Sequence, residues 1–356
     1  MKKWNVCVLF GGISPEHEVS LRSAEAVLNH IDKEKYNIFP VGITREGAWL
    51  FFPDTDYSKL PQDTWQDCEG VCPAAISPAR GQGLLLFQNE CPILQSVDVV
   101  FPVLHGANGE DGSVQGLMQL AGIPCVGPEV AASAVSMDKT LTKLVIDHAG
   151  IPQATWELVR KSELENHLDN ILSRIENRFS YPVFVKPAGT GSSVGVSKAA
   201  DREALIAALQ TAVFYDEKIL VEEFIHGREI EVAVLGNESP VASICGEIDS
   251  GAEFYDYDAK YINDTSVAYV PARIDEEVSE KVREYAVRAY RALGCQGLSR
   301  VDFFVTYEDN RIVFNEINTL PGFTSISMYP KLFEASGIAY SQLIDKLLEY
   351  AMEETK

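Results

Sequence analysis

The composition describes a globular, acidic protein. The chain has 356 residues, of which 46% are hydrophobic, and this supplies core material for two or three domains. It carries 30 Lys and Arg against 52 Asp and Glu, so the formal net charge is −22 at pH 7. Such a charge opposes nonspecific binding to nucleic acid or to an anionic membrane. We therefore expect small-molecule partners, with no nucleic acid and no membrane among them.

Targeting signals and cysteines point to a reducing compartment. No apolar run reaches the roughly 20 residues that span a bilayer, and the start, MKKWNVCVLFGG, lacks the cleavage site of a signal peptide. The seven cysteines are scattered, and Cys68 and Cys72 have no second close pair that would complete a zinc site. We expect a cytoplasmic protein with reduced, mostly structural thiols.

The first residues predict a β-turn-α-β unit. Residues 4–10 are apolar and predict a strand, and residues 11–18, GGISPEHE, predict a turn. A helix-like run follows as far as Ile31, and YNIFPVGI at 36–43 predicts the next strand. This pattern is typical of a doubly wound α/β domain.

A further buried strand is predicted at 97–105, followed by the loop GANGEDG and a short helix closed by Gly122. Residues from about 51 to 94 are rich in Pro, Gly, Gln and Asp and show little periodicity. We expect an irregular insertion there.

Around Gly127 the chain changes character. MDKTLTKLVIDHAGI, residues 137–151, predicts an amphipathic helix with a glycine stop, and YPVFVKP, residues 181–187, predicts a strand that leads into a glycine-rich loop. The last segment predicts strands at 227–236 and 239–248, a helix at 276–294, two more strands and a helix at 341–354. We expect three domains, comprising residues 1–127, 128–224 and 225–356.

Two of the late strands carry carboxylates in unusual places. Glu316 and Asn318 share one face of an otherwise apolar strand, because side chains two apart point the same way. If SRVDFFV pairs with it through the loop Glu308–Asn310, Asp302 lies opposite Glu316 and Arg300 opposite Asn318. Facing carboxylates are unfavourable unless a cation lies between them, and two carboxylates with an amide oxygen suit Mg²⁺. A different register that leaves both carboxylates solvated remains open.

The glycine-rich loop is a second anomaly. Lys186 ends an apolar strand, where a charge needs an anionic partner. The loop Ala188–Ser193 can offer backbone N–H groups and hydroxyls to phosphate. It lacks the Gly-Lys-Ser/Thr ending of a P-loop, and Gly11 and Gly12 form no dinucleotide fingerprint. A flexible hairpin tip is the alternative.

Two N-terminal stretches invite both structural and functional interpretations. His105 follows a strand at the edge where open α/β sheets bind ligands, although a structurally satisfied histidine is an alternative, and Asp111 is better explained as a helix cap. Ser14 and Glu16 fit an N-cap and a first-turn acid. Glu16 or Glu18 either complements the helix dipole or anchors a substrate ammonium.

Eight blocks in order along the chain resemble the D-alanyl-D-alanine ligase family of ATP-grasp enzymes: GGISPEHEVSLRSA, HGANGEDGSVQG, SMDKTLTK, VKPAGTGSSVGV, EEFIHGREIEVAVLG, EFYDYDAKY, GLSRVDFF and NEINTLPGFTSISMYPKL. The resemblance implies an α/β protein with an N-terminal doubly wound (pre-ATP-grasp) domain and a two-part ATP-grasp fold. ATP would lie between the central and C-terminal domains. A homodimer is a family expectation.

The chemistry implied by the resemblance has two steps and serves peptidoglycan precursor synthesis. The carboxylate of one D-alanine attacks the γ-phosphate of ATP, giving an acyl phosphate and ADP. The amine of a second D-alanine then attacks that carbonyl, and phosphate leaves. Two Mg²⁺ or Mn²⁺ ions accompany ATP.

The resemblance also implies residue roles. The ATP-binding residues would be Lys139, Lys186, Ser193, Glu222 and Glu229. The metal ligands would be Asp302, Glu316 and Asn318. Catalytic roles would fall to Glu16, Ser192, Tyr261 and Arg300, of which Arg300 stabilises the oxyanion. Substrate contacts would come from His105, Lys260, Gly322, Ser327 and Met328.

The resemblance leaves open which second substrate accepts the D-alanyl group. Relatives that confer glycopeptide resistance join D-alanine to D-lactate or D-serine, typically carry arginine at the position of Met328 and alter the FYDYxAKY block. Here the block is intact and the residue is methionine, which favours D-alanine. The insertion and the NTLPGFTS tail look somewhat like the resistance branch, so a D-alanine–D-serine ligase is the alternative. A different ATP-grasp ligase, a silent nucleotide binder and a nicotinamide oxidoreductase all fit the motifs less well.

Overall fold

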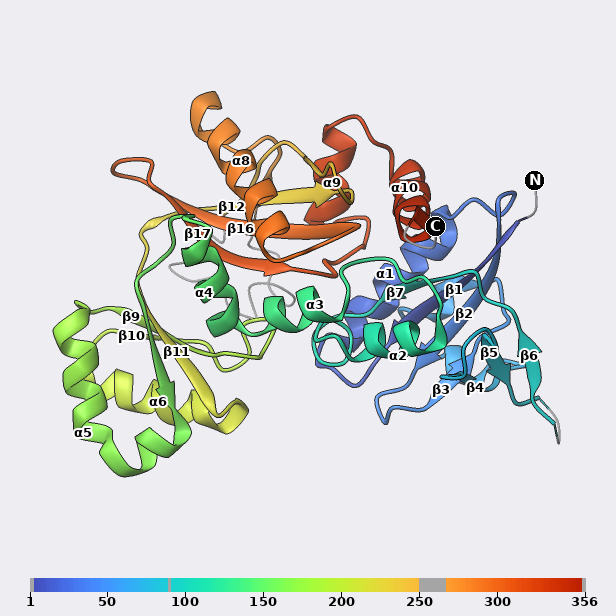
Figure 1. The fold of residues 1–356 in the computed structure, drawn as a ribbon, viewed down its shortest axis with the longest axis horizontal. Coiled ribbons are helices and arrows are strands. Elements are labelled where there is room, and N and C mark those ends of the chain that lie inside the picture. Colours follow the sequence, from blue (N-terminus) through green and yellow to red (C-terminus); the bar gives the residue numbers. More distant parts are fainter. Residues whose placement is uncertain (1–2, 89–90, 250–266, 354–356) are drawn as a thin grey trace.

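The computed structural model describes residues 3–88, 91–249 and 267–353, and within these ranges the strands form three sheets (Figure 1). The first is central to the N-terminal part of the chain. Its β1 (Trp4–Gly11) pairs in parallel with β2 (Tyr36–Ile43) on one side and with β7 (Val99–Val103) on the other. The helices α1 (His17–His30) and α2 (Ser113–Ala121) follow β1 and β7. The predicted β-turn-α-β unit is confirmed.

The prediction of an irregular insertion at 51–94 is wrong. The segment contains η1 (Tyr57–Lys59), η2 (Trp65–Asp67), β4 (Cys72–Ile76), β5 (Leu84–Leu86) and most of β6 (Ile93–Gln95). Together with β3 (Trp49–Phe51), these strands extend the sheet in the order β6-β5-β4-β3-β2-β1-β7. Strands of three to five residues are too short for alternation to show in the sequence.

Trp65 anchors this segment to the sheet. Its side chain is fully buried, with its ring 5.0 Å from that of Phe10. A Cβ added at Gly42 would lie 2.2 Å from the Trp65 ring, so glycine is needed for the close approach.

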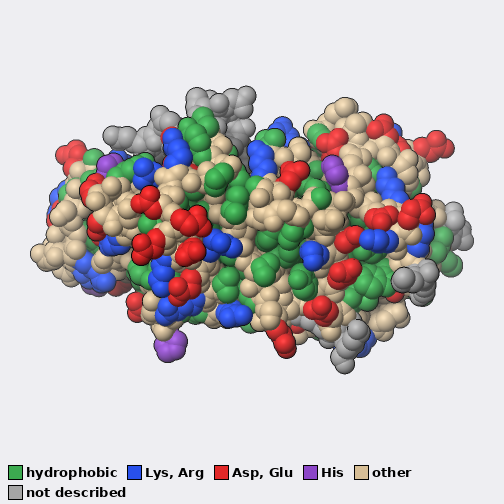
Figure 2. All heavy atoms as spheres, turned by 90° about the horizontal axis from the view of Figure 1, so that it is seen from above, with side chains coloured by type: hydrophobic (Ala, Val, Ile, Leu, Met, Phe, Trp, Pro, Cys, Tyr) green, Lys and Arg blue, Asp and Glu red, His purple; other side chains and the backbone are tan. Residues whose placement is uncertain are grey.

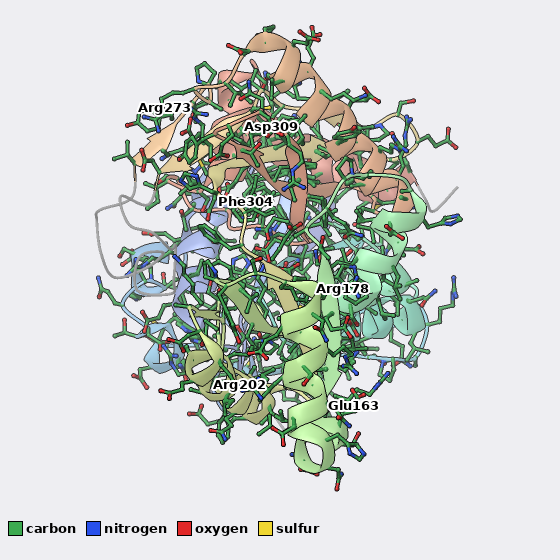
Figure 3. All side chains as sticks on the ribbon, turned by 90° about the vertical axis from the view of Figure 1, so that its left-hand side faces the viewer. Glu163, Arg178, Arg202, Arg273, Phe304 and Asp309 are labelled. Atoms are coloured by element: carbon green, nitrogen blue, oxygen red, sulfur yellow. The ribbon has the colours of Figure 1, made fainter. Side chains whose placement is uncertain are left out.

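The second sheet is antiparallel, in the order β10-β9-β11-β8. Its elements, with the two helices that precede them, are α3 (Val130–Met137), α4 (Lys139–His148), β8 (Trp156–Arg160), α5 (Lys161–Arg178), β9 (Val183–Pro187), β10 (Ser197–Ala199), α6 (Arg202–Tyr215) and β11 (Lys218–Glu223). Figure 3 shows Glu163 and Arg178 near the two ends of α5 on the outside of this sheet. The predicted helix at 137–151 is α4, and Gly150 follows it with φ +64°.

The third sheet holds the acidic hairpin. Its path is β15-β14-β12-β16-β17, with β13 paired to β12. The elements are β12 (Gly227–Leu235), β13 (Val241–Ala242), β14 (Gly246–Asp249), β15 (Val267–Tyr269), α8 (Glu276–Ala292), β16 (Leu298–Thr306), β17 (Ile312–Asn318), α9 (Met328–Ala335) and α10 (Tyr340–Glu353). The single strand predicted at 239–248 is wrong, because β13 and β14 are separate. The predicted helices at 276–294 and 341–354 correspond to α8 and α10.

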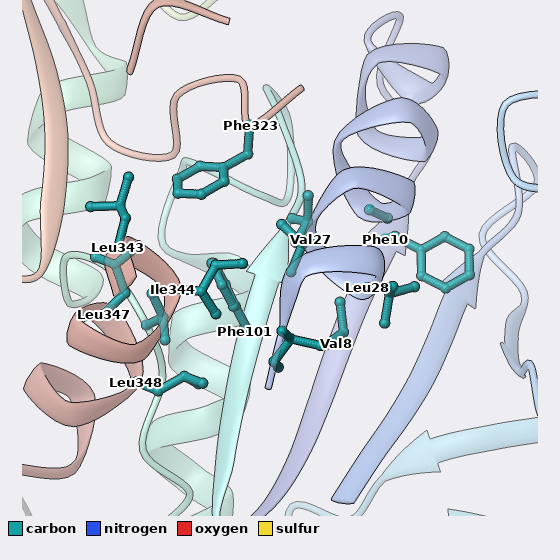
Figure 4. Close-up of a cluster of buried hydrophobic side chains, with 14 of the residues drawn as sticks. Val8, Phe10, Val27, Leu28, Phe101, Phe323, Leu343, Ile344, Leu347 and Leu348 are labelled. Atoms are coloured by element: carbon teal, nitrogen blue, oxygen red, sulfur yellow. The ribbon is translucent and has the colours of Figure 1, made fainter. Parts of the chain in front are cut away.

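The first and last parts of the chain share one buried core (Figure 4). Val8 and Phe10 of β1, Leu28 of α1 and Phe101 of β7 belong to the same apolar cluster as the residues of α10. From α10 the cluster includes Leu343, Ile344, Leu347 and Leu348, all fully buried. The C-terminal helix therefore completes the N-terminal core.

The surface carries mixed charge. In Figure 2, Lys and Arg lie interspersed with Asp and Glu over the face shown. Among the helices of the described residues, none has both the length and the apolar character needed to cross a membrane.

Candidate active site

One cavity gathers the predicted site. Its volume is about 1070 Å³, and residues within or directly after strands of all three sheets line it. The predicted residues on its walls are Glu16, His105, Lys139, Lys186, Ser192, Ser193, Glu222, Glu229, Arg300, Asp302, Glu316, Asn318, Gly322, Ser327 and Met328. Lys260 and Tyr261 lie outside the described residues. Predictions made from separate stretches of sequence thus meet in one place.

The predicted hairpin pairing is confirmed. β16 and β17 are antiparallel, with Asp302 opposite Glu316 and Arg300 opposite Asn318. The route to this pairing differs from the predicted one. Thr306 N–H donates to the Arg311 carbonyl at 3.1 Å, so the loop is one residue longer than predicted. A β-bulge then restores the predicted register, because Asp302 pairs with Glu316 whereas the next residue, Phe303, pairs with Phe314.

Arg300 and the carboxylates form a compact charged cluster. The Arg300 guanidinium donates to both oxygens of Asp302 at 2.8 Å and lies 3.3 Å from Glu231, which is opposite Asp302 on β12. Burial lowers the pKa of Arg300, but Asp302 and Glu231 outweigh it and raise that pKa well above its ordinary value. The Asn318 amide donates to Asp302 at 3.0 Å. Glu231 was missed, although it lies two residues after Glu229 on the same strand face.

The hairpin offers hard oxygen ligands. No group of three His, Cys, Asp or Glu suited to a metal occurs among the residues that the structure describes. The available set is the Asp302 and Glu316 carboxylates with the Asn318 amide oxygen, all on the cavity wall. Mg²⁺ commonly takes one or two carboxylates and completes its octahedron with water and phosphate oxygens, so these residues fit the predicted ion.

Facing the hairpin is a lysine–carboxylate–lysine cluster in which Glu222 and Lys143 are buried and Lys186 is partly exposed to the cavity. Glu222 on β11 contacts Lys186 of β9, with Nζ to Oε2 2.5 Å, and also contacts Lys143 of α4. Burial raises the pKa of Glu222, but the two lysines outweigh burial and hold it at about 2. Burial lowers the pKa of Lys143, whereas Glu222 raises that of Lys186 against burial. Lys143 was missed, although it lies one helical turn after Lys139.

The glycine-rich loop is fastened at several points. Lys139 donates from Nζ to the Thr190 carbonyl at 2.5 Å and from its backbone to Ala188 at 3.0 Å. Ser192 and Ser193 adopt positive φ angles of 50° and 57°. Val194 N–H donates to the Gly191 carbonyl at 3.1 Å, so the two serines are the central residues of a tight turn. Positive φ at both positions fits a hairpin tip as well as a ligand-binding loop.

The same loop runs over the start of α1. A Cβ at Gly191 would lie 3.3 Å from Oε2 of Glu16, and one at Gly106 would lie 3.0 Å from the same oxygen. Ser14 Oγ accepts the Glu16 N–H at 3.0 Å, but α1 begins at His17 with Glu16 as its N-cap residue and Glu18 in its first turn. The predicted N-cap role of Ser14 and first-turn position of Glu16 are therefore wrong, because the preceding residues form a separate turn. Two glycines therefore leave room for the Glu16 carboxylate at the cavity.

The loop after β7 contributes His105 and Glu110. His105 is buried, and its Nδ1 lies 2.9 Å from the Leu320 carbonyl. Glu110 accepts the N–H of Gly106 at 2.8 Å and that of Leu320 at 3.0 Å. Sequence reasoning passed over Glu110 although it lies in the quoted HGANGEDG block. Its neighbour Asp111 accepts the N–H of Ser113 at 2.9 Å, but the N-cap residue of α2 is Gly112, so the predicted role of Asp111 as the cap is wrong by one residue.

Glu110 should make the stability depend on pH. Burial, and then Glu16, raise its pKa from 4.5 to about 7. Folding therefore favours the protonated form, so the stability that it contributes is complete below about pH 4.5 and is lost as the pH rises through about 7. Glu110→Gln removes this titration. The difference in free energy of unfolding, wild type minus variant, should fall by up to about 3 kcal/mol between about pH 5 and pH 8 in denaturant titrations. A difference that stays constant with pH contradicts this.

Gly322, Ser327 and Met328 also line the cavity and lie shortly after Leu320 in the chain. Ser327 Oγ accepts the Thr324 N–H at 3.0 Å, and a Cβ at Gly322 would lie 2.9 Å from that oxygen. Met328 begins α9 and is buried, with its Cε methyl so close that a Cβ at Gly246 would lie 2.3 Å away.

Aromatic residues line another part of the cavity. The rings of Phe184 and Phe224 are 6.0 Å apart, and Lys198 Nζ lies 4.7 Å from the Phe224 ring centroid. Glu229 and Tyr307 line the same cavity. A flat base can stack in such surroundings, and the sequence reasoning had singled out only Glu229 among these residues.

An antiparallel sheet with a glycine-rich loop faces a second sheet with an acidic hairpin across one cavity, and this fold and site define an ATP-grasp ligase. The family model "D-ala D-ala ligase N-terminus" matches residues 5–128, and "D-ala D-ala ligase C-terminus" matches residues 145–349. The chain belongs to the D-alanine–D-alanine ligase family.

Relatives agree over their full lengths. A D-alanine–D-alanine ligase of Caldicellulosiruptor bescii is 51% identical over 100% of this chain and 97% of the relative. A D-alanine–D-alanine ligase of Acetivibrio thermocellus is 50% identical over 99% of this chain and 96% of the relative. Among solved structures, the VanG D-Ala:D-Ser ligase from Enterococcus faecalis matches with TM-score 0.89 and 41% identity, over 98% of this chain and 100% of that one. The D-alanine-D-alanine ligase from Coxiella burnetii matches with TM-score 0.85 and 35% identity, over 99% of this chain and 95% of that one.

Proposed function

We propose that this protein joins two D-alanines into D-alanyl-D-alanine, with ATP converted to ADP and phosphate, to supply a peptidoglycan precursor. The observation that carries the proposal is the single cavity in which Lys186, Glu16, Arg300 and the Asp302–Glu316 pair meet. The family membership and relatives at about half identity support it, and their names favour D-alanine over D-serine as acceptor.

In the first step the protein positions and neutralises charge. Lys139 and Lys186 line the cavity as cations for the phosphates, and Glu222 orients the Lys186 ammonium. Two Mg²⁺ held by Asp302, Glu316 and Asn318 would neutralise phosphate charge when bound. Ser193 belongs to the loop that covers the phosphates and excludes water.

In the second step an amide forms. The amine nitrogen of the second D-alanine bonds to the acyl carbon, the bond from that carbon to the phosphate oxygen breaks, and the amine loses a proton. Arg300, joined by the backbone of Gly322, stabilises the negative charge that develops on the carbonyl oxygen. Glu16 binds the ammonium of the first D-alanine, within a hydrogen-bonded set that includes Ser192 and Tyr261.

The remaining assignments belong to the same proposal. Glu229 binds the nucleoside end of ATP, His105 lies near the first D-alanine, and Lys260 reaches the phosphate or the first carboxylate. Ser327 and the backbone of Met328 receive the acceptor carboxylate. We further propose domains at 1–127, 128–224 and 225–356, and a cytoplasmic homodimer; the three separate sheets support the division of the chain.

The test supplies Mg-ATP with D-alanine alone, then adds D-serine or D-lactate, and identifies the products by mass spectrometry alongside phosphate release. D-alanyl-D-alanine as the dominant product is expected. A D-alanyl-D-serine product would retain the mechanism but change the acceptor. Absence of release with every D-amino acid would overturn the proposal.

Met328→Arg should depress D-alanine as acceptor. The methionine is buried against Gly246, and arginine brings both bulk and charge to that wall. We expect kcat/KM for the second D-alanine to fall by about tenfold or more, because a pocket change of this kind is worth about 1–3 kcal/mol. Met328→Leu is the control and should stay near wild type. Unchanged acceptor preference in Met328→Arg contradicts the role.

A further inference from the structure

We propose that Glu110, His105 and Ser23 are positioning residues for the acyl-transfer step: together they clamp the backbone of residues 320–323, which carries Gly322. The inference rests on the proposed function and assigns roles that the sequence did not suggest for Glu110 and Ser23. Residues 320–323 connect the end of β17 to the segment before α9.

Glu110 and His105 bind the backbone of Leu320, Glu110 at its N–H and His105 at its carbonyl. Leu320 donates its N–H to Glu110 Oε1 at 3.0 Å, and its carbonyl accepts from His105 Nδ1 at 2.9 Å. The other Glu110 oxygen accepts the Gly106 N–H at 2.8 Å, which ties the clamp to the loop after β7. Residues 215 positions apart in the chain are joined in this way.

Ser23 binds a second backbone position in the same segment, the N–H of Phe323. Its Oγ accepts the Phe323 N–H at 3.2 Å and lies 3.4 Å from His105 Nε2. With a neutral His105 ring, Nδ1–H donates to the Leu320 carbonyl and the Ser23 hydroxyl donates to Nε2. Burial lowers the pKa of His105, which agrees with a neutral ring.

The clamp brackets Gly322. Leu320 is fixed on one side and Phe323 on the other, and the Phe323 carbonyl also accepts from the Tyr340 hydroxyl. Pro321 restricts its own φ, which leaves little freedom between the anchors. A glycine without such anchors would lose its orientation toward the reacting carbonyl, and oxyanion stabilisation depends on donors fixed in advance.

The clamp acts on one wall of the cavity. The lysines and the glycine-rich loop that serve ATP lie on other elements, β9 and α4, and none of the hydrogen bonds that make up the clamp reaches them. Loosening the clamp should therefore slow amide formation more than acyl phosphate formation. A general loss of structure would slow both.

The experiment compares Glu110→Gln with Asp111→Asn in the full-length enzyme. Glutamine is isosteric but presents one acceptor oxygen to two N–H groups. Asp111 is the matched control, because it is the adjacent acid and its carboxylate accepts from the backbone of Asn108 and Ser113 rather than from Leu320. Two rates are measured: D-alanyl-D-alanine formation, and D-alanine-dependent heavy-oxygen scrambling within ATP, which reports acyl phosphate formation.

We expect Glu110→Gln to reduce dipeptide formation about 100-fold while scrambling stays within about threefold of wild type. Asp111→Asn should leave both rates within about threefold. Dipeptide formation near the wild-type rate in Glu110→Gln, or equal loss of both rates, would overturn the proposal.

Ser23→Ala provides a second route if Glu110→Gln fails to fold. It removes the acceptor for Phe323 and should shift the ratio of the two rates in the same direction, and an unchanged ratio would overturn the clamp. The wild-type enzyme separates the hypotheses: failure to form the dipeptide rejects the proposed function, whereas normal wild-type activity with unaffected variants rejects only the clamp.

Discussion

Glu316→Gln should lower kcat by about a thousand-fold or more without unfolding the protein. The carboxylate lies opposite Asp302 on the cavity wall, and its removal takes one negative ligand from the predicted metal set. A bound divalent ion supplies several kcal/mol of transition-state stabilisation, and each 1.36 kcal/mol is tenfold in rate. Steady-state kinetics over a range of Mg²⁺ concentrations measures the loss and any shift in the Mg²⁺ requirement.

Glu308→Gln is the matched control for this experiment. Glu308 is an exposed glutamate in the loop of the same hairpin and pairs with His226 rather than with the hairpin carboxylates. It should keep wild-type turnover. Wild-type turnover in Glu316→Gln, at every Mg²⁺ concentration, would refute the metal assignment. Asp302→Asn should also abolish turnover, but it disturbs Arg300 as well and is the less specific probe.

Glu222→Gln should lower the free energy of unfolding by about 3 kcal/mol, because it leaves the buried ammonium of Lys143 and the partly buried ammonium of Lys186 without their shared counter-charge. Lys143→Met in the same chain should recover a large part of the loss, since it removes one buried charge while keeping a side chain of similar length. Denaturant unfolding of the two single variants and the double variant measures the coupling.

The stability provided by Glu222 also has a defined pH range. Its pKa in the folded protein is about 2, below the ordinary 4.5, so this stability is present above about pH 4.5 and is lost as the pH falls toward 2. If the losses of unfolding free energy in Glu222→Gln and Lys143→Met simply add in the double variant, the two residues and Lys186 do not act as one coupled cluster.

The facing residues of the acidic hairpin were predicted correctly, although the loop length assumed in that prediction was wrong. The loop is longer than predicted by one residue and a bulge compensates, so the facing pairs came out right while the pairing nearer the loop did not. A one-residue shift moves every side chain to the other face, and no local pattern announces the bulge. Asn315, which the bulge leaves unpaired, reaches Lys186 at 3.4 Å, a contact between sheets that sequence cannot show.

Other misses have similar physical causes. β4, β5 and β6 are each three to five residues long, so their strand character comes from neighbours in the sheet rather than from their own alternation. The helix α3 was not predicted, and its N-cap residue Glu129 makes no side-chain capping bond. Lys143, Glu231 and Glu110 carry charges that a sequence suggests are solvated, yet residues distant in the chain bury Lys143 and Glu231 and leave Glu110 only partly exposed.

The shared core described above dictates an order of events during synthesis. α10, the last 14-residue helix, packs on α1 and β7 and supplies Leu343, Ile344, Leu347 and Leu348 to the cluster that contains Val8. Lys35 also bonds Asp345 at 2.6 Å. The apolar face of the amino-terminal sheet therefore cannot be fully buried during translation until α10 has been synthesised and has packed against it.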